Sequence, residues 1–175
     1  MKGKEVILGL LNTKCGLTGY QINDILQIHL RHFYDGGFGM IYPTLKNLEK
    51  DGLVSKKRIN QDDKPNKNIF FITDSGKIEF KKSVNEKTEP EILKSDFLMK
   101  IYFGDSLLPG KQIDFLKEEL NRKKSDLNDL LSNMSDWDSN GITDHQNFTV
   151  TYGMAYYKAV IEVIQLQLDS YNKRK

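Results

Sequence analysis

The order of hydrophobic patterns in the first 85 residues constrains the fold of this chain more than any other sequence feature. Three segments with apolar residues at helical spacing come first, then two segments rich in β-branched and aromatic residues, then one more short helical segment. These segments span residues 4–14, 18–30, 38–51, 53–59, 67–73 and 74–84. This is the order of a winged helix-turn-helix, so we expect a mainly α-helical chain with a small β-hairpin.

The third helix is the expected recognition helix, because its outward face suits the major groove of DNA. Ile41, Leu45 and Leu48 form its apolar face, and its one acidic residue, Glu49, lies near the C-terminal end. Pro43 is expected in or next to the first turn, where backbone N–H groups have no intrahelical partner and a proline costs little. The outward residues expected to contact DNA are Gly39, Tyr42, Pro43, Thr44, Lys46 and Asn47.

The hairpin is basic and adds candidate phosphate contacts on either side of a groove. These candidate residues are Lys56, Lys57, Arg58, Lys64 and Lys67. Residues 1–85 hold 14 basic against 9 acidic residues, and residues 86–175 hold 12 against 15, so we expect only the front half to bind a polyanion. Two alternatives stay open: the hairpin charges are only solvated, or the winged helix is a protein-interaction module without specific DNA binding.

Four segments resemble the PadR family of bacterial transcriptional regulators: Ile7–Leu11, Thr18–Ile22, Phe71–Gly76 and above all Met40–Val54, with its Tyr-Pro, spaced leucines, Glu and Gly-Leu. The resemblance implies a sequence-specific regulator of double-stranded DNA, by family habit a repressor. It also implies that further residues lie at the DNA surface, where a Tyr hydroxyl donates to phosphate. These residues are Tyr20, Tyr42 and Pro43, and Thr18 beside them is a further DNA-binding candidate. Inward packing of the Tyr42 ring is the competing interpretation.

The back half is expected to form a C-terminal α-helical dimerisation domain, 87–175, after the winged-helix domain, 1–86. A helix is predicted to open at 89–91, and two long helices, about 109–134 and 147–172, carry apolar residues at alternating spacings of three and four. The candidate dimerisation residues are Ile113, Leu116, Leu120, Val150, Met154, Tyr157, Ile161, Ile164 and Leu168.

The last helix has a second apolar stripe, formed by Tyr152, Tyr156, Val160 and Val163. Since one chain offers only one long partner helix for two apolar faces, the remaining face needs a second molecule. We therefore expect a homodimer, which would present two recognition helices to a palindromic operator. A small-molecule effector near the helical core would change their spacing. Its pocket could be lined by the aromatic residues of the last helix, Tyr152, Tyr156 and Tyr157, with core packing as the competing interpretation.

The PadR resemblance is weaker in this half. Longer members of the family carry a helical dimerisation region of about this size, sometimes described as virulence-activator-like. Members often have a Trp in the last helix, where this chain has Leu166 and Leu168, and Trp137 is expected in a loop. Because of this departure, we do not expect a drug-binding site formed by a Trp of the last helix.

We expect no catalytic residues, no cofactor and no metal. His29 and His32 have a metal-compatible spacing without a third ligand, so solvated histidines explain them better. Residues 136–147 partly match a calcium-loop pattern, but Asn147 replaces the bidentate Glu, and a chance match in a linker is the competing interpretation.

The expected compartment is the cytoplasm. No apolar run approaches the ~18 residues that span a bilayer, and the N-terminal pattern is that of an amphipathic helix rather than a signal peptide. The single cysteine, Cys15, allows no internal disulfide, as is usual in a reducing compartment.

Overall fold

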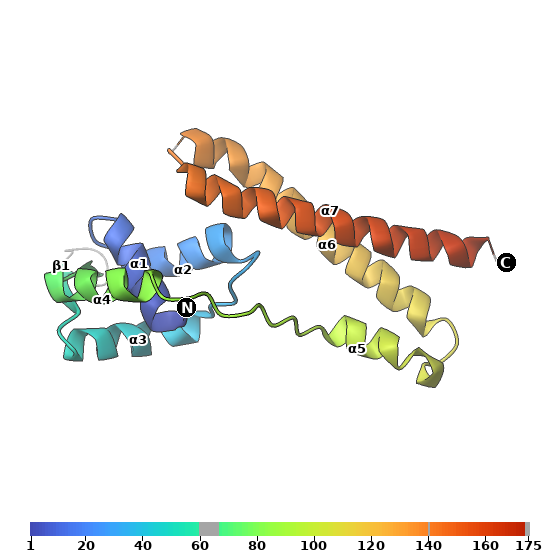
Figure 1. Cartoon of the computed structure of the whole chain (residues 1–175), viewed down its shortest axis with the longest axis horizontal. Coiled ribbons are helices and arrows are strands. Elements are labelled where there is room, and N and C mark those ends of the chain that lie inside the picture. Colours follow the sequence, from blue (N-terminus) through green and yellow to red (C-terminus); the bar gives the residue numbers. More distant parts are fainter. Residues whose placement is uncertain (60–66, 140, 174–175) are drawn as a thin grey trace. The chain divides into compact units, whose positions relative to one another are not determined.

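A computed structural model describes residues 1–59, 67–139 and 141–173, apart from the side chains of 135, 136 and 138 (Figure 1). The chain divides into two compact units, Met1–Glu91 and Ile92–Lys175, which we call the winged-helix unit and the helical unit. The mainly helical fold with one small hairpin is confirmed.

The winged-helix unit has the expected order of three helices, a hairpin and a helix. Its elements are α1 (Gly3–Thr13), α2 (Gly19–Ile25), a π-helical turn η1 (Leu26–Leu30), α3 (Phe38–Lys50), β1 (Val54–Ile59), β2 (Lys67–Ile72) and α4 (Asp74–Val84). One apolar core joins them, with Ile7, Leu8, Ile22, Leu26, Ile41 and Leu45 fully buried. Each such side chain contributes roughly 1.5–3 kcal/mol through burial.

The start of α2 is fixed by a capping box. The Thr18 hydroxyl accepts from the Gln21 backbone N–H at 3.2 Å, and the Gln21 side-chain oxygen accepts from the Thr18 N–H at 2.9 Å. Just before it, Leu17 pairs with Phe70 of β2 in an isolated antiparallel bridge. The helix-turn-helix is therefore joined to the hairpin by backbone hydrogen bonds.

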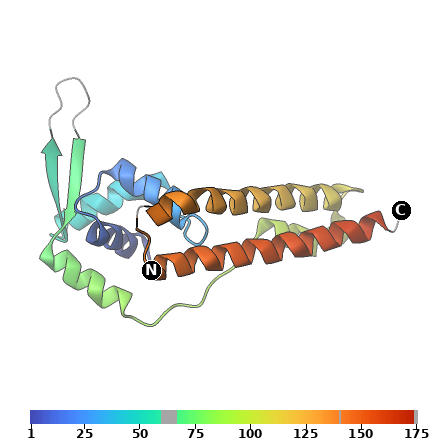
Figure 2. The ribbon, with the colours of Figure 1, turned by 90° about the horizontal axis from the view of Figure 1, so that it is seen from above.

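The hairpin pairs β1 with β2 antiparallel, with Val54 opposite Ile72 and Ile59 opposite Lys67. Val54 and Phe70 anchor it in the core, while the side chains of β1 beyond Val54 are exposed. Figure 2 shows the two strands projecting from the helices of their unit as a wing.

The helical unit consists of α5 (Asp96–Tyr102), a 3-10 turn η2 (Gly104–Ser106), α6 (Lys111–Ser139) and α7 (Asp144–Asn172). The two long helices lie side by side and antiparallel (Figures 1 and 2). Two apolar clusters join them, and the buried members of these clusters are Leu116, Leu120, Ile164 and Leu168, and Leu130, Trp137, Val150 and Tyr157.

Two sequence-based boundaries in the back half were wrong. Helix α5 begins at Asp96 rather than at 89–91, because the Ser95 hydroxyl caps it by accepting from the Leu98 N–H at 3.1 Å. Helix α6 runs on to Ser139, so Trp137 is helical and only 6% exposed, not in a loop. The 136–147 stretch is thus not a twelve-residue loop: its first four residues are helical, residue 140 lies outside the described residues, and α7 begins at Asp144.

Within the described residues, every helix is too short or too polar to cross a membrane.

Candidate nucleic-acid interface

Helix α3 turns its polar side outward. Ile41, Leu45 and Leu48 are almost completely buried. The predicted DNA-binding residues of the helix therefore share the outer face: Gly39, Tyr42, Pro43, Lys46 and Asn47 are exposed and Thr44 is half-buried. Glu49, half-buried near the C-terminal end, is the only carboxylate of α3. This face can meet a polyanion without charge repulsion.

Pro43 lies deeper in α3 than the sequence suggested. It is the sixth residue of the helix, beyond the first turn. A residue with an N–H at this position would donate to the carbonyl of Gly39, four residues earlier, and proline removes that bond. The Gly39 carbonyl thus lacks its helical donor on the outward face.

Three aromatic rings connect the two helices of the helix-turn-helix. The rings of Tyr20 in α2 and Tyr42 in α3 both contact the Phe38 ring, each with a centroid separation of 5.7 Å. The Tyr42 ring packs over Gly19, where an added Cβ would come within 2.7 Å of it. Phe38 was not among the sequence-based candidates. Its position after two glycines, at the start of the expected recognition helix, could have indicated a DNA-facing aromatic residue.

Thr18 lies at this interface but is only 6% exposed. Its hydroxyl and backbone N–H are both occupied by the capping box with Gln21. The side chain thus positions the first turn of α2, and with it Tyr20, rather than presenting a free donor.

The wing presents its basic residues on exposed strands. Lys56, Lys57, Arg58 and Lys67 are all exposed, whereas Lys64 lies outside the described residues. The ammonium group of Lys56 forms an ion pair with Glu49 of α3 at 3.0 Å. This contact joins the wing to the recognition helix and offsets one of the wing's positive charges.

The candidate dimerisation residues form the seam between α6 and α7 of a single chain. Leu116, Leu120, Val150, Tyr157, Ile164 and Leu168 are buried there, and Ile113, Met154 and Ile161 are half-buried. The opposite side of α7 carries an exposed apolar row that we call the outer stripe. It consists of Phe148, Tyr152, Tyr156, Val163 and Leu166. Val160, expected on this second stripe, is half-buried against the core.

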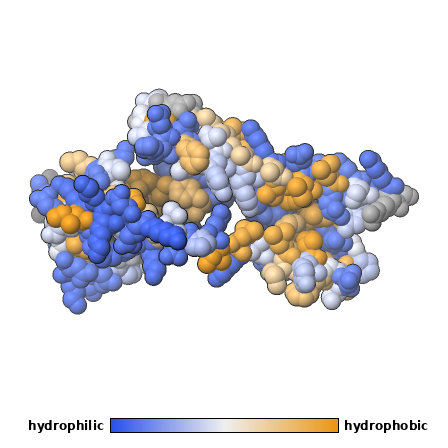
Figure 3. Space-filling model, in the orientation of Figure 1, coloured by the Kyte–Doolittle hydropathy of each residue, from blue (hydrophilic) through white to orange (hydrophobic). Residues whose placement is uncertain are grey.

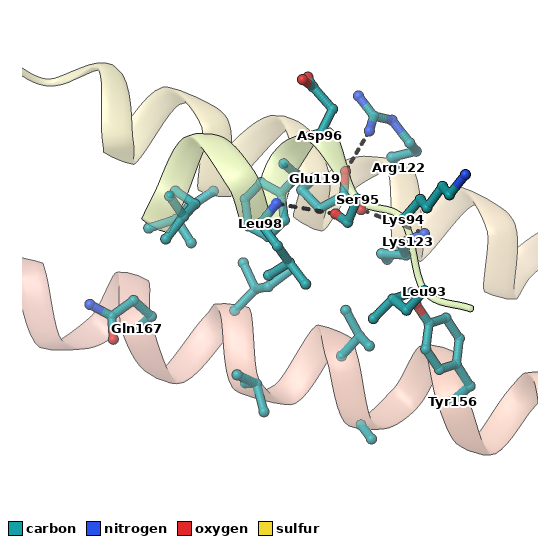
Figure 4. A pocket seen from close by; sticks show the side chains of 17 residues that line it. Leu93, Lys94, Ser95, Asp96, Leu98, Glu119, Arg122, Lys123, Tyr156 and Gln167 are labelled. Carbon is teal, nitrogen blue, oxygen red and sulfur yellow. Dashed lines mark hydrogen bonds and ion pairs between the residues drawn. The ribbon is translucent and has the colours of Figure 1, made fainter. Parts of the chain in front are cut away.

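A groove of about 800 Å³ runs between α5, α6 and α7 of the helical unit (Figure 4). Tyr156 and Val163 of the outer stripe belong to its wall, and Leu93 faces Tyr156 across it. On α6, Lys123 contacts the buried Glu119 at 3.5 Å and its ammonium lies 5.5 Å from the Tyr157 ring. Figure 3 shows apolar residues gathered where α5 faces α7.

The described residues contain no group of three or more His, Cys, Asp or Glu side chains that could hold a metal ion.

A winged helix whose recognition helix carries no carboxylate before Glu49, beside a basic wing, is typical of winged-helix DNA-binding regulators. Residues 7–82 match the family model "Transcriptional regulator PadR-like family". The chain is 34% identical over 128 residues to the negative transcriptional regulator PadR of Bacillus subtilis. The aligned region covers 73% of this chain and 70% of the Bacillus subtilis protein. The chain therefore belongs to the PadR-like family of transcriptional regulators.

Solved structures of similar proteins have the same fold over nearly the whole chain. Protein smu.1604c of Streptococcus mutans is 45% identical, with a TM-score of 0.90 over 97% of this chain and 99% of its own. The PadR-like regulator BC1756 of Bacillus cereus is 36% identical, with a TM-score of 0.90 over 99% and 100%. Bacillus subtilis PadR, solved in complex with operator DNA, is 29% identical, with a TM-score of 0.80 over 95% and 97%.

Proposed function

We propose that this regulator is a homodimeric repressor that binds a palindromic operator in double-stranded DNA through two winged helices. The observation that carries the proposal is the outer face of α3, which is exposed and contains no carboxylate before Glu49. The operator complex and the negative role named for Bacillus subtilis PadR support it. The proposal includes no catalytic activity and places the protein in the cytoplasm, with the DNA.

In this proposal the residues divide by chemistry. Tyr20, Tyr42 and the basic wing residues Lys56, Lys57, Arg58, Lys64 and Lys67 bind phosphates and set the position of α3. Thr44, Lys46 and Asn47 reach base edges, while Gly39 and Pro43 let the DNA approach the first turns of α3 closely. Thr18 caps α2 and so orients this helix without contacting the DNA itself.

Two substitutions, one on the wing and one on α3, should change DNA binding in opposite directions. Lys57→Ala removes a phosphate contact, so we expect weaker binding to all sequences and a salt slope flatter by about one. Glu49→Gln releases Lys56 from its 3.0 Å ion pair, so we expect tighter binding and a steeper slope by up to about one. Fluorescence anisotropy across a salt series measures both, with Lys158→Ala in the helical unit as the control. A protein-interaction module would show no response to either substitution.

Gly39→Ala should stabilise the protein and weaken DNA binding. A Cβ at Gly39 would meet no other atom of the described chain within 4 Å, and alanine in a helix is favoured over glycine by about 0.5–1 kcal/mol. We expect the free protein to melt a few degrees higher. If DNA approaches here, the added methyl should lower affinity roughly tenfold, about the cost of one lost base contact. If Gly39→Ala raises stability but leaves DNA affinity unchanged, the DNA does not contact the protein at Gly39.

We further propose that the homodimer forms through the outer stripe of α7, because the seam already joins α6 to α7 within one chain. Exposed rows of large apolar side chains of this length mark interaction surfaces. A second copy on the stripe would also cover the groove beside Tyr156 and Val163. A small-molecule effector in this groove would then contact both subunits and shift the spacing of the two winged helices.

A further inference from the structure

We propose that Phe38 reads thymine methyl groups in the major groove and so helps to determine which operator the protein selects. This inference rests on the proposed DNA-binding function. Phe38 would thus contribute to sequence recognition although its side chain forms no hydrogen bonds.

Phe38 stands where a recognition helix meets base edges. It is the first residue of α3, directly after the N-cap Gly37, and N-terminal residues of recognition helices are those that contact bases. Its neighbours Gly37 and Gly39 carry no side chains, and the described chain offers no atom within 4 Å of a Cβ at either position. Phe38 is therefore the large side chain that projects at this end of the helix.

The ring is exposed but in contact with two other rings. Phe38 is 44% exposed in the winged-helix unit. The rings of Tyr20 and Tyr42 contact it at interplanar angles of 41° and 69°. Because two rings contact the phenyl group, binding to DNA would cost less side-chain entropy than it would for a freely rotating residue.

The chemistry of the phenyl ring limits which groups of the DNA it can bind. A phenyl group has no donor or acceptor, so it binds neither phosphates nor the polar atoms of base edges. The apolar group that the major groove presents on a base is the C5-methyl of thymine, and cytosine lacks it. The two Tyr hydroxyls can donate to phosphates and so fix the height of the ring in the groove.

The test uses a duplex that the full-length protein enriches from a random-sequence library. Each thymine is replaced in turn by deoxyuridine, which removes only the methyl group, and the dissociation constant is measured by fluorescence anisotropy at 150 mM salt. At one thymine per half-site we expect about fourfold weaker binding, the effect of one lost methyl-sized contact, and about sixteenfold when both half-sites are replaced.

Phe38→Ala should bind the thymine duplex more weakly and show no further loss with deoxyuridine at the same position, because the two changes remove one contact. Tyr20→Phe is the matched control: it removes a phosphate donor, lowers affinity for both duplexes and keeps the deoxyuridine penalty. Melting curves show whether Phe38→Ala is folded, and Phe38→Leu, with a smaller apolar side chain, should retain part of the penalty.

The inference is overturned if no deoxyuridine replacement weakens the wild-type protein, or if Phe38→Ala keeps the full penalty, as packing between helices or contact with deoxyribose would predict. The failure of the proposed function looks different, because the library would then yield no enriched duplex at all.

Discussion

Val163→Asp is expected to separate the dimer into monomers and to lower operator affinity by about two orders of magnitude or more. Val163 is 66% exposed within one chain, so an aspartate there costs the isolated subunit little. In a dimer formed through the outer stripe, two-fold symmetry would bury two unpaired carboxylates against apolar side chains, at a cost of several kcal/mol. A monomer also loses the gain from binding two linked half-sites.

Analytical ultracentrifugation measures the first effect and fluorescence anisotropy the second. Lys158→Asp is the matched control, because it places the same carboxylate on an exposed position of α7 outside the outer stripe. We expect this control to remain dimeric. If the Val163→Asp protein stays dimeric with unchanged operator affinity, the dimer interface is not the outer stripe.

Gly76→Ala is expected to destabilise the winged-helix unit by about 3 kcal/mol or more. Gly76 is buried near the start of α4, and an added Cβ would lie 2.1 Å from the Leu53 carbonyl oxygen and 2.8 Å from Ile72 Cγ1. A clash with a backbone oxygen cannot be relieved by a side-chain rotation, so the start of α4 must shift. This shift would disturb the helix cap, in which the Thr73 hydroxyl accepts from the Gly76 N–H at 3.1 Å.

Thermal unfolding of the full chain followed by circular dichroism measures this loss. We expect the transition of the winged-helix unit to fall by at least about 10 °C, from the usual relation between stability and melting temperature in domains of this size. Gly39→Ala serves as the paired control, since alanine at that open helical position is expected to raise the transition. If both substitutions had the same small effect, the close packing of α4 on the Leu53 backbone would be wrong.

Local signals predicted most of the winged-helix unit correctly. The Thr18 and Gln21 pair marks the start of α2 because a capping box needs only residues three apart, and Gly52 ends α3 with a φ of +70°. The outward position of Lys46 and Asn47 follows from helical periodicity alone. Such features depend on a few neighbouring residues, so the sequence displays them directly.

Other features depend on tertiary contacts that sequence spacing does not reveal. An apolar seam at alternating spacings looks the same whether the partner helix belongs to the same chain or to another, and here α6 of the same chain occupies it. Trp137 continues α6 because it is buried in a cluster with Val150 and Tyr157. The ion pair of Lys56 with Glu49 also joins separate elements, so the sequence does not distinguish Lys56 from the other basic residues of the wing.

The most direct test of the DNA-binding account is the affinity ratio between two duplexes at 150 mM salt, measured with the full-length protein. One duplex is enriched by the protein from a random library, and the other is its scrambled version with the same base composition. The account predicts a ratio of about 10³ or more, with two related half-sites in the enriched duplex. Equal binding to both duplexes, or binding to neither, would contradict it.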